Sequence, residues 1–191
     1  MRAASDTDRA MERYAAGEDA AFARLYDSLA PRILGYLIRH TNDPRDAEDL
    51  LQQTMLQIHR GRGRFIAGAE VTPWAFTIAR HLLVDRLRRK HLGGGGVDAS
   101  NLETRPSEGP GADDVVHARQ LAICLERAMS DLPESQRLIL ELVKDEGLSF
   151  IEAAQVLGTT VGAVKARAHR AYQTLRAGLA QPGTGLRRSA R

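Results

Sequence analysis

The segment of residues 149–176 constrains the fold more than any other stretch, because it holds two short helical patterns separated by a tight turn. Ser149 and Glu152 have the spacing of a capping box, in which the hydroxyl and the carboxylate each accept from a free backbone N–H. Gly158 follows the first pattern and is free to adopt the positive φ that ends a helix. Thr160 then predicts the start of a second helix as its N-cap.

The second helical pattern has two different faces. Apolar residues recur at helical spacing on one stripe, namely Val161, Val164, Ala168, Ala171 and Leu175. The other face combines small residues with cations: Gly162, Ala163, Ala166, Lys165, Arg167, His169 and Arg170. Two helices joined by a glycine turn, the second with such a face, indicate a helix-turn-helix that binds the DNA major groove. The alternative is a helical hairpin whose charged face meets water, which does not explain the caps, the turn and the small residues together.

Residues 10–40 predict two helices, the second opening at Pro31. Asp43 and Pro44 then predict a helix start by the combination of a cap and a proline in the first turn. This helix is expected to reach about Arg60 and to bury Ala47, Leu50, Leu51, Met55 and Ile58. Asp49, Gln52 and Gln53 lie beside that stripe and are candidates for a partner contact. A solvated face with acids that favour the helix N-terminus explains them equally well.

Residues 61–71 are rich in glycine and predict a loop that carries Arg62 and Arg64. Thr72 and Pro73 start the next helix, which runs to about Lys90 and turns inward Ala75, Ile78, Ala79, Leu82, Leu83 and Leu87. Its other face presents Trp74, Thr77, Arg80, His81 and Arg88, with Arg86, Arg89 and Lys90 adding charge at the end. Such a face suits single-stranded nucleic acid, because bases stack on the ring while cations follow the phosphates. A packed tryptophan and cations at a helix C-terminus are the alternative, which explains Arg80 and His81 poorly.

The region between these two parts predicts a linker. Residues 92–112 contain four consecutive glycines, two prolines and an excess of acids, and a structureless stretch of this length is uncommon inside one compact domain. Helices are expected again over 113–131 and from Leu132 and Pro133 to Val143, and the tail is expected to fray. The predicted class is all-α, with helical domains at 10–91 and 113–178, a flexible linker at 92–112 and a tail at 179–191.

Composition narrows the functional classes. The single cysteine, Cys124, excludes an internal disulfide framework and a cysteine-rich zinc site, and its apolar helical surroundings predict a buried position. The six histidines show no metal-ligand spacing and no glycine loop fits a nucleotide fingerprint, so we expect neither an enzyme nor a cofactor, metal or small-molecule substrate. The absence of a membrane-length apolar run and of a signal peptide predicts a soluble cytoplasmic protein. Clustered arginines and a pI near 9.3 favour nucleic-acid contact at local patches.

Three blocks resemble one protein family: DAEDLLQQTMLQIHR (46–60), TPWAFTIARHLLVDRLRR (72–89) and LPESQRLILELVKDEGLSFIEAAQVLGTTVGAVKARAHRAYQTLR (132–176). In this order they resemble the extracytoplasmic-function (ECF) group of bacterial sigma-70 factors. The resemblance implies an initiation subunit that recruits RNA polymerase core to specific promoters and promotes strand opening. Its partners would be the clamp and flap of the core, promoter DNA and an anti-sigma factor. The first domain would bind the clamp and the −10 element, and the second the −35 element.

The resemblance also implies residue roles. Asp49, Gln52 and Gln53 match the clamp-binding D-L-x-Q-E, with glutamine in place of the usual glutamate. The single-strand contacts would come from the loop at 62–71, where the family captures a flipped base, and from the face of Arg62, Arg64, Trp74, Thr77, Arg80, His81 and Arg88. His81 stands where asparagine is usual, and Phe76 and Thr77 are atypical. The −35 contacts would come from Thr160, Lys165, Arg167, His169 and Arg170, in a helix that lacks two of the family's usual hydroxyls.

Two other functions compete with a sigma factor. A stand-alone helix-turn-helix regulator would bind duplex DNA without acting as a polymerase subunit, but it leaves the Asp49 helix and the Trp74 face without a role. A nucleic-acid-modifying enzyme is the third, although no catalytic residues can be assembled from this sequence. Binding to purified core polymerase distinguishes the first from the second.

Overall fold

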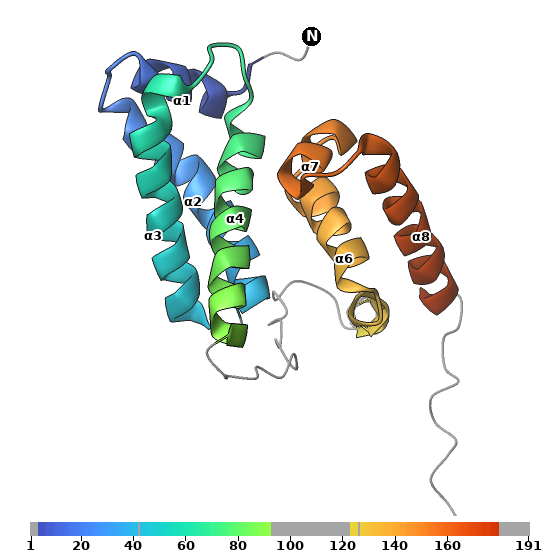
Figure 1. Cartoon of the computed structure of the whole chain (residues 1–191). Coiled ribbons are helices and arrows are strands. Elements are labelled where there is room, and N and C mark those ends of the chain that lie inside the picture. The colour runs from blue at the N-terminus through green and yellow to red at the C-terminus, as the bar shows by residue number, and fades with distance from the viewer. Residues whose placement is uncertain (1–3, 42, 93–122, 126, 180–191) are drawn as a thin grey trace, which may run out of the picture. The chain divides into compact units, whose positions relative to one another are not determined.

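The structure is a computed structural model that describes residues 4–41, 43–92, 123–125 and 127–179. These residues form helices joined by turns and loops, without a strand among them, and the chain divides into two compact units. The predicted all-α class with two helical units is thereby confirmed (Figure 1). The expected linker at 92–112 (apart from Leu92), most of the helix expected over 113–131 and nearly all of the tail at 179–191 lie outside the described residues.

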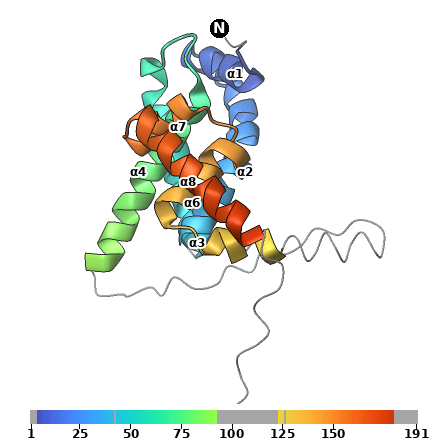
Figure 2. The ribbon, with the colours of Figure 1, turned by 90° about the vertical axis from the view of Figure 1, so that its right-hand side faces the viewer.

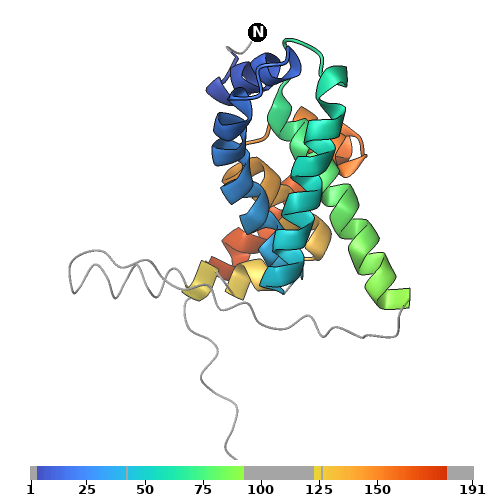
Figure 3. The same ribbon diagram turned by 90° about the vertical axis from the view of Figure 1, so that its left-hand side faces the viewer.

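The N-terminal unit is built from four helices and a short 3₁₀ turn. They are α1 (Asp6–Ala15), α2 (Ala21–Thr41), α3 (Pro44–Gly61), η1 (Arg62–Arg64) and α4 (Val71–Leu92). The long helices α2, α3 and α4 pack on one another, and α1 crosses one end of them beside the connection from α3 to α4 (Figures 1 and 3). Their core side chains are almost inaccessible, among them Leu25, Ile33, Tyr36, Leu37, Leu50, Ile58, Ala75 and Phe76. This core fixes the faces of α3 and α4 that remain exposed.

The predicted helix boundary at Pro31 is wrong, because α2 continues through it. A proline inside a helix removes a backbone hydrogen bond and costs about 3 kcal/mol. Leu29 and Ile33 are fully buried on either side of the proline, while Pro31 itself is exposed. Burying such a side chain is worth about 1.5–3 kcal/mol, so packing on both sides outweighs the local cost. The helix α1, which the sequence analysis did not predict, begins at a capping box between Ser5 and Asp8.

The starts of α3 and α4 are set in different ways. Asp43 caps α3 as predicted, its carboxylate accepting from the backbone N–H of Arg45 at 3.0 Å. The helix α4 begins at Val71, before the predicted cap at Thr72. The backbone N–H of Val71 donates instead to the carboxylate of Asp8 in α1, at 2.8 Å. A side chain distant in sequence therefore supplies an acceptor at the start of α4, and Thr72 lies inside the helix instead of capping it.

The inward face of α4 agrees with the prediction in part. Ala75, Ala79 and Leu83 are buried as expected, whereas Ile78, Leu82 and Leu87 are half-buried. Phe76 is fully buried, although the sequence analysis did not place it inward. Its ring meets that of Tyr36 edge-on, with the two centroids 5.6 Å apart.

The described C-terminal unit contains helical residues at 123–125 and 127–130, then α6 (Glu134–Leu140), a π-helical turn η2 (Glu141–Asp145), α7 (Phe150–Leu157) and α8 (Val161–Leu179). The helix α8 packs against α6 (Figure 2), and Ala171 lies in a buried cluster with Leu132 and Leu140. Cys124 is half-buried rather than buried as predicted, and Ile123 and Leu125 beside it are exposed, so this turn of the helix faces solvent on more than one side.

Candidate nucleic-acid interface

The helix-turn-helix forms as the sequence predicts. Glu152 and Ser149 exchange hydrogen bonds at the start of α7, each side chain accepting from the backbone N–H of the other residue. Gly158 ends α7 with a φ of +61°. The hydroxyl of Thr160 accepts from the backbone N–H of Ala163 at 3.2 Å and so caps α8. The three local signals therefore fix the turn that orients the second helix.

The two faces of α8 separate apolar from cationic side chains. Val164, Ala168 and Ala171 are buried, and Val161 and Leu175 are half-buried. On the opposite side Gly162, Lys165, Ala166, His169 and Arg170 are exposed, with Ala163 and Arg167 half-buried. No atom of the described residues lies within 4 Å of a Cβ placed on Gly162, so the start of this face is open within that part of the chain. A backbone or a base edge can approach the helix closely there.

The cations of this face are not neutralised within the described part of their unit. No carboxylate of residues 123–125 or 127–179 forms an ion pair with Lys165, Arg167 or Arg170. Arg170 only donates from Nε to the backbone carbonyl of Ala166, at 3.3 Å. The ring of His169 meets the amide of Gln173 at 3.0 Å. The guanidinium ends therefore retain donors for an anionic ligand such as phosphate or a guanine edge.

Trp74, the tryptophan of the N-terminal unit's candidate strand-binding face, is packed on one side. Its ring is half-buried and its centroid lies 5.7 Å from that of Phe65. A Cβ placed on Gly61 would lie 3.0 Å from Cζ2 of the ring, so the absence of a side chain at Gly61 makes room for the indole. Part of the ring therefore serves the fold, and only the remainder is available to a base.

The other predicted strand-binding residues differ in how free they are. His81, Arg88 and Arg64 are exposed, while Arg80 is half-buried and its Nε has no hydrogen-bond partner among the residues that the structure describes. Thr77 donates its hydroxyl proton to the carbonyl of Pro73. Arg62 lies 5.4 Å from the ring centroid of Tyr14 in α1 and donates to the carbonyl of His59.

The candidate polymerase-binding residues share the exposed face of α3. Asp49, Gln52 and Gln53 are all exposed, and Leu56 one turn further on remains 45% exposed. These side chains are accessible to a partner, and Leu56 adds an apolar group to the same helix.

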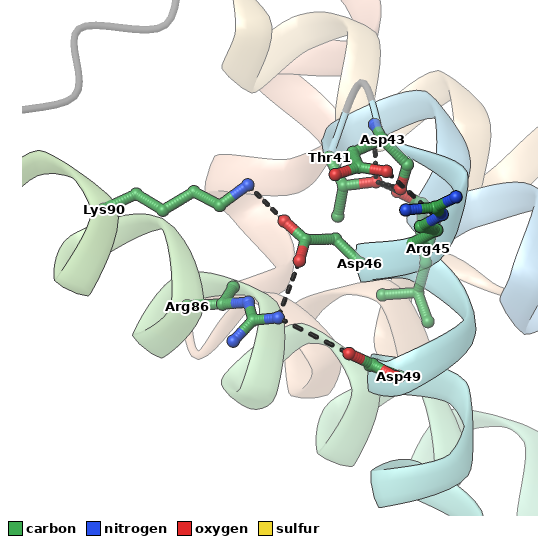
Figure 4. Close-up of polar contacts among 8 residues, drawn as sticks. Thr41, Asp43, Arg45, Asp46, Asp49, Arg86 and Lys90 are labelled. Atoms are coloured by element: carbon green, nitrogen blue, oxygen red, sulfur yellow. Dashed lines mark hydrogen bonds and ion pairs between the residues drawn. The ribbon is translucent and has the colours of Figure 1, made fainter.

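Two cations of α4 are used inside the unit, which the sequence analysis did not foresee. Figure 4 shows Asp46 of α3 between Lys90 and Arg86, both of α4. Arg86 lies 2.6 Å from Asp46 and 3.7 Å from Asp49. Lys90, followed by Arg86, holds the pKa of the Asp46 carboxyl below its ordinary value against the opposing effect of burial. These two cations therefore tie α4 to α3 and are not part of a free cationic surface.

The described residues contain neither a membrane-spanning helix nor a metal-binding group. In the described part of the chain, no helix is long and apolar enough to cross a membrane. Among the same residues, no three histidine, cysteine, aspartate or glutamate side chains lie together in a way that could hold a metal ion.

Comparisons with known proteins fit this geometry of a helical unit followed by a helix-turn-helix unit. Residues 25–92 match the family described as Sigma-70 region 2, and residues 122–175 match the one described as Sigma-70, region 4. RNA polymerase sigma factor CarQ of Myxococcus xanthus is 36% identical over 87% of this chain and 93% of that protein. ECF RNA polymerase sigma factor SigF of Caulobacter vibrioides is 34% identical over 83% and 86% respectively.

Two solved structures share the fold. RpoE of Bartonella quintana, in complex with the anti-sigma factor NepR, has a TM-score of 0.65 at 24% identity, covering 85% of this chain and 98% of that one. CnrH in complex with the cytosolic domain of CnrY has a TM-score of 0.64 at 21% identity, covering 94% and 100%. The two matched regions define a sigma-70-type transcription factor. The chain belongs to the ECF group of this family and is an RNA polymerase sigma factor.

Proposed function

We propose that this sigma factor divides its work between three surfaces: the exposed face of α3 for polymerase core, the Trp74 face with its loop for the opened strand, and α8 for duplex DNA. The observation that carries this proposal is the exposed face of α8. It combines an open glycine start, small side chains and cations that lack ion-pair partners in the described unit. These features suit insertion into a major groove with cations at the phosphate rims.

The assignment of domains follows from the same surfaces. The domain at 10–91 would bind the clamp of the core and the −10 element, and the domain at 113–178 would bind the −35 element and the flap. The matches to region 2 over 25–92 and to region 4 over 122–175 support this division. The exposed row of Asp49, Gln52 and Gln53 supports the clamp contact, because these side chains are not needed for the core of the unit.

Three finer statements complete the proposal. The chain acts as a cytoplasmic subunit without a catalytic activity of its own, since the polymerase core supplies the chemistry. An anti-sigma factor is a further partner, as it is for RpoE of Bartonella quintana. A candidate anti-sigma factor should compete with core polymerase for the chain. Co-elution of the chain with core in the presence of the candidate measures this competition.

The decisive experiment mixes the chain with purified core polymerase and restriction-digested genomic DNA of its source organism. Co-elution with core and discrete run-off transcripts are expected, and duplex binding without core would favour a stand-alone regulator instead. The double variant Asp49→Ala/Gln52→Ala should lower affinity for core at least tenfold, because hydrogen bonds to charged groups are worth about 1.5–3 kcal/mol each. Glu48→Ala, an exposed acid of the same helix, is the matched control. Unchanged core binding by the double variant would contradict the α3 contact.

A second experiment addresses the strand-binding face. His81→Ala and Arg80→Ala should leave core binding and the closed complex nearly intact but impair opening, because a stacked or phosphate-bound strand stabilises only the opened state. Permanganate footprinting of unpaired thymines measures this on linear promoter DNA. Opening should recover largely on a template with a premelted bubble. Normal opening of duplex promoters by both variants would remove this face from the melting surface.

A further inference from the structure

The loop between η1 and α4, here called the α3–α4 loop (residues 65–70), lies outside the regular helices yet has a defined conformation. The backbone N–H of Ala69 donates to the carbonyl of Ile66 at 3.0 Å. Gly68 adopts a φ of +83°, which favours glycine. Ile66 is 76% exposed, more than any other large apolar side chain of the described residues. The loop thus holds an apolar side chain out toward solvent.

The second half of this loop is held by two carboxylates of α1. Glu12 Oε1 accepts from the backbone N–H of Gly68 at 2.7 Å. Asp8 Oδ1 accepts from the backbone N–H of Val71 at 2.8 Å, where the loop enters α4. The other oxygen of Asp8 accepts from the backbone N–H and the hydroxyl of Ser5. One 7%-exposed carboxylate therefore fixes the start of α1 and the start of α4 together.

The chain just before the loop is contacted by α1 as well. Tyr14 of α1 makes a hydrogen bond through its hydroxyl to Nδ1 of His59, near the end of α3. The guanidinium of Arg62 in η1 lies 5.4 Å from the centroid of the same ring. The helix α1 packs against both η1 and α4 (Figure 3). The helix α1 thus contacts the chain before, within and after the loop.

Two carboxylates beside a loop that meets DNA would by themselves repel the phosphates. Their hydrogen bonds explain the placement, because backbone N–H groups at a loop tip and at a helix N-terminus favour a charged acceptor. Ordering the loop before the strand arrives also removes an entropic cost from binding. The helix α1 lies outside residues 25–92, which match region 2.

We propose that α1 is a positioning element for strand opening, with Glu12 and Asp8 holding the α3–α4 loop in the conformation that receives the displaced strand. This inference rests on the proposed function, in which that loop contacts the −10 element. The positioning residues touch the loop backbone and not the DNA, so their loss leaves the side chains of the loop unchanged but lets its backbone move. The expected defect is slower opening, with core binding and the closed complex unaffected.

The test uses the full chain bound to core polymerase. The template is a DNA fragment that carries a promoter identified by the run-off transcripts. Glu12→Ala should slow permanganate-detected opening of the duplex at least fivefold, and a premelted bubble should restore it. Glu12→Gln keeps an oxygen that can accept from Gly68 and should stay within twofold of the parent. Glu18→Ala removes an exposed acid whose carboxylate pairs with Arg13, away from the α3–α4 loop, and controls for the change in charge.

A second measurement is independent of activity. Amide hydrogen exchange of the free chain should be faster at Gly68 in Glu12→Ala than in the parent, while core amides of α2 and α3 exchange alike in both. The proposal is overturned if Glu12→Ala opens promoters as fast as the parent, or if Glu12→Gln and Glu18→Ala are equally slow. It is also overturned if Glu12→Ala loses core binding, because α1 would then serve the whole unit. Failure of the parent itself to give promoter-specific transcripts with core would instead refute the proposed function.

Discussion

The helices α4 and α8 both carry clustered cations, yet they use them differently. In α4, Arg86 and Lys90 pair with Asp46, and Arg86 also lies 3.7 Å from Asp49. In α8, Lys165 and Arg170 are exposed, and no carboxylate in the described part of that unit pairs with them. A similar density of charge in the sequence therefore serves the fold in α4, whereas in α8 it leaves exposed cations that are available to a ligand.

The difference shows what decides the role of a surface cation. Asp46 lies at the start of α3, where packing of α3 on α4 brings it opposite the last turns of α4. Its side chain is 12% exposed, so water screens the pairing weakly. The helix α8 packs on α6 through a buried stripe that includes Ala171, and Lys165 and Arg170 lie exposed outside this stripe. Mutations of the two sets should therefore separate stability from DNA binding.

The largest expected effect is on stability, from Asp46→Ala. Removal of this carboxylate leaves Arg86 and Lys90 without their partner at a partly buried site. Breaking a fully buried pair costs about 3–5 kcal/mol, and because both cations are about a third exposed we expect about 2 kcal/mol here. Urea unfolding followed by fluorescence of Trp74, the single tryptophan of the chain, reports on this unit. The control Glu48→Ala should shift the unfolding midpoint little. Equal shifts in the two variants would show that the ion pairs of Asp46 do not stabilise the packing of α3 on α4.

On the opposite side of the comparison, Arg167→Ala or Arg170→Ala should change DNA recognition and not stability. Loss of a bidentate arginine contact to guanine typically costs about 1–3 kcal/mol of discrimination. Lys165→Ala should weaken all sequences alike and lower the salt slope by about one unit. Affinities of the holoenzyme for promoter variants in the −35 element, measured at several salt concentrations, separate the two patterns. Undiminished −35 selectivity in both arginine variants would show that the face of α8 does not read bases.

Local patterns explain why the helix-turn-helix of α7 and α8 could be predicted. Each signal acts between residues at most a few positions apart: the capping box at Ser149, the positive φ of Gly158 and the cap at Thr160. The same holds for the cap of α3 by Asp43. In each case the residue type and spacing carry the physical cause, and the structure confirms the predicted contact.

The features that the sequence did not reveal depend on distant contacts. Asp8 and Val71 are 63 positions apart, and Asp46 and Arg86 are 40 apart. No periodicity within a helix indicates such a partner, so Arg86 and Lys90 looked like part of a cationic surface. The capping box of Ser5 and Asp8 was recognisable from its spacing and would have located α1. The continuation of α2 through Pro31 required knowledge of the packing on both sides. The DNA and polymerase roles of the candidate residues stay predictions.

A smaller effect is expected from pH, and it sharpens the account of Asp46. Its folded-state pKa lies below the ordinary value of 3.8, chiefly because of Lys90 and then Arg86. The stabilisation is therefore present above pH 3.8 and lost as pH falls through the lowered folded-state pKa. The difference in unfolding free energy between the parent and Asp46→Asn should be constant near neutrality and shrink below about pH 4. This change should be smaller than that of Asp46→Ala, since a protonated carboxyl still accepts a hydrogen bond. A difference that does not diminish at all as the pH falls below 3.8 would contradict the pairing.

The smallest expected effect is that of Asp49→Ala on stability. It tests whether Asp49, unlike Asp46 in the same helix, contributes little to holding α3 against α4. Asp49 is one turn from Asp46 and approaches the same guanidinium, but at 3.7 Å and with its side chain 62% exposed. Exposed pairs contribute about 0–1 kcal/mol, and because Arg86 keeps its closer contact to Asp46 we expect a change below about 0.5 kcal/mol. Urea unfolding followed by Trp74 fluorescence measures this, with Asp46→Ala in the same series. A loss for Asp49→Ala comparable to that for Asp46→Ala would place Asp49 among the residues that hold α3 to α4. Binding of the Asp49 carboxylate to the clamp would then destabilise the fold, and the proposed acidic contact of the α3 face would have to be abandoned.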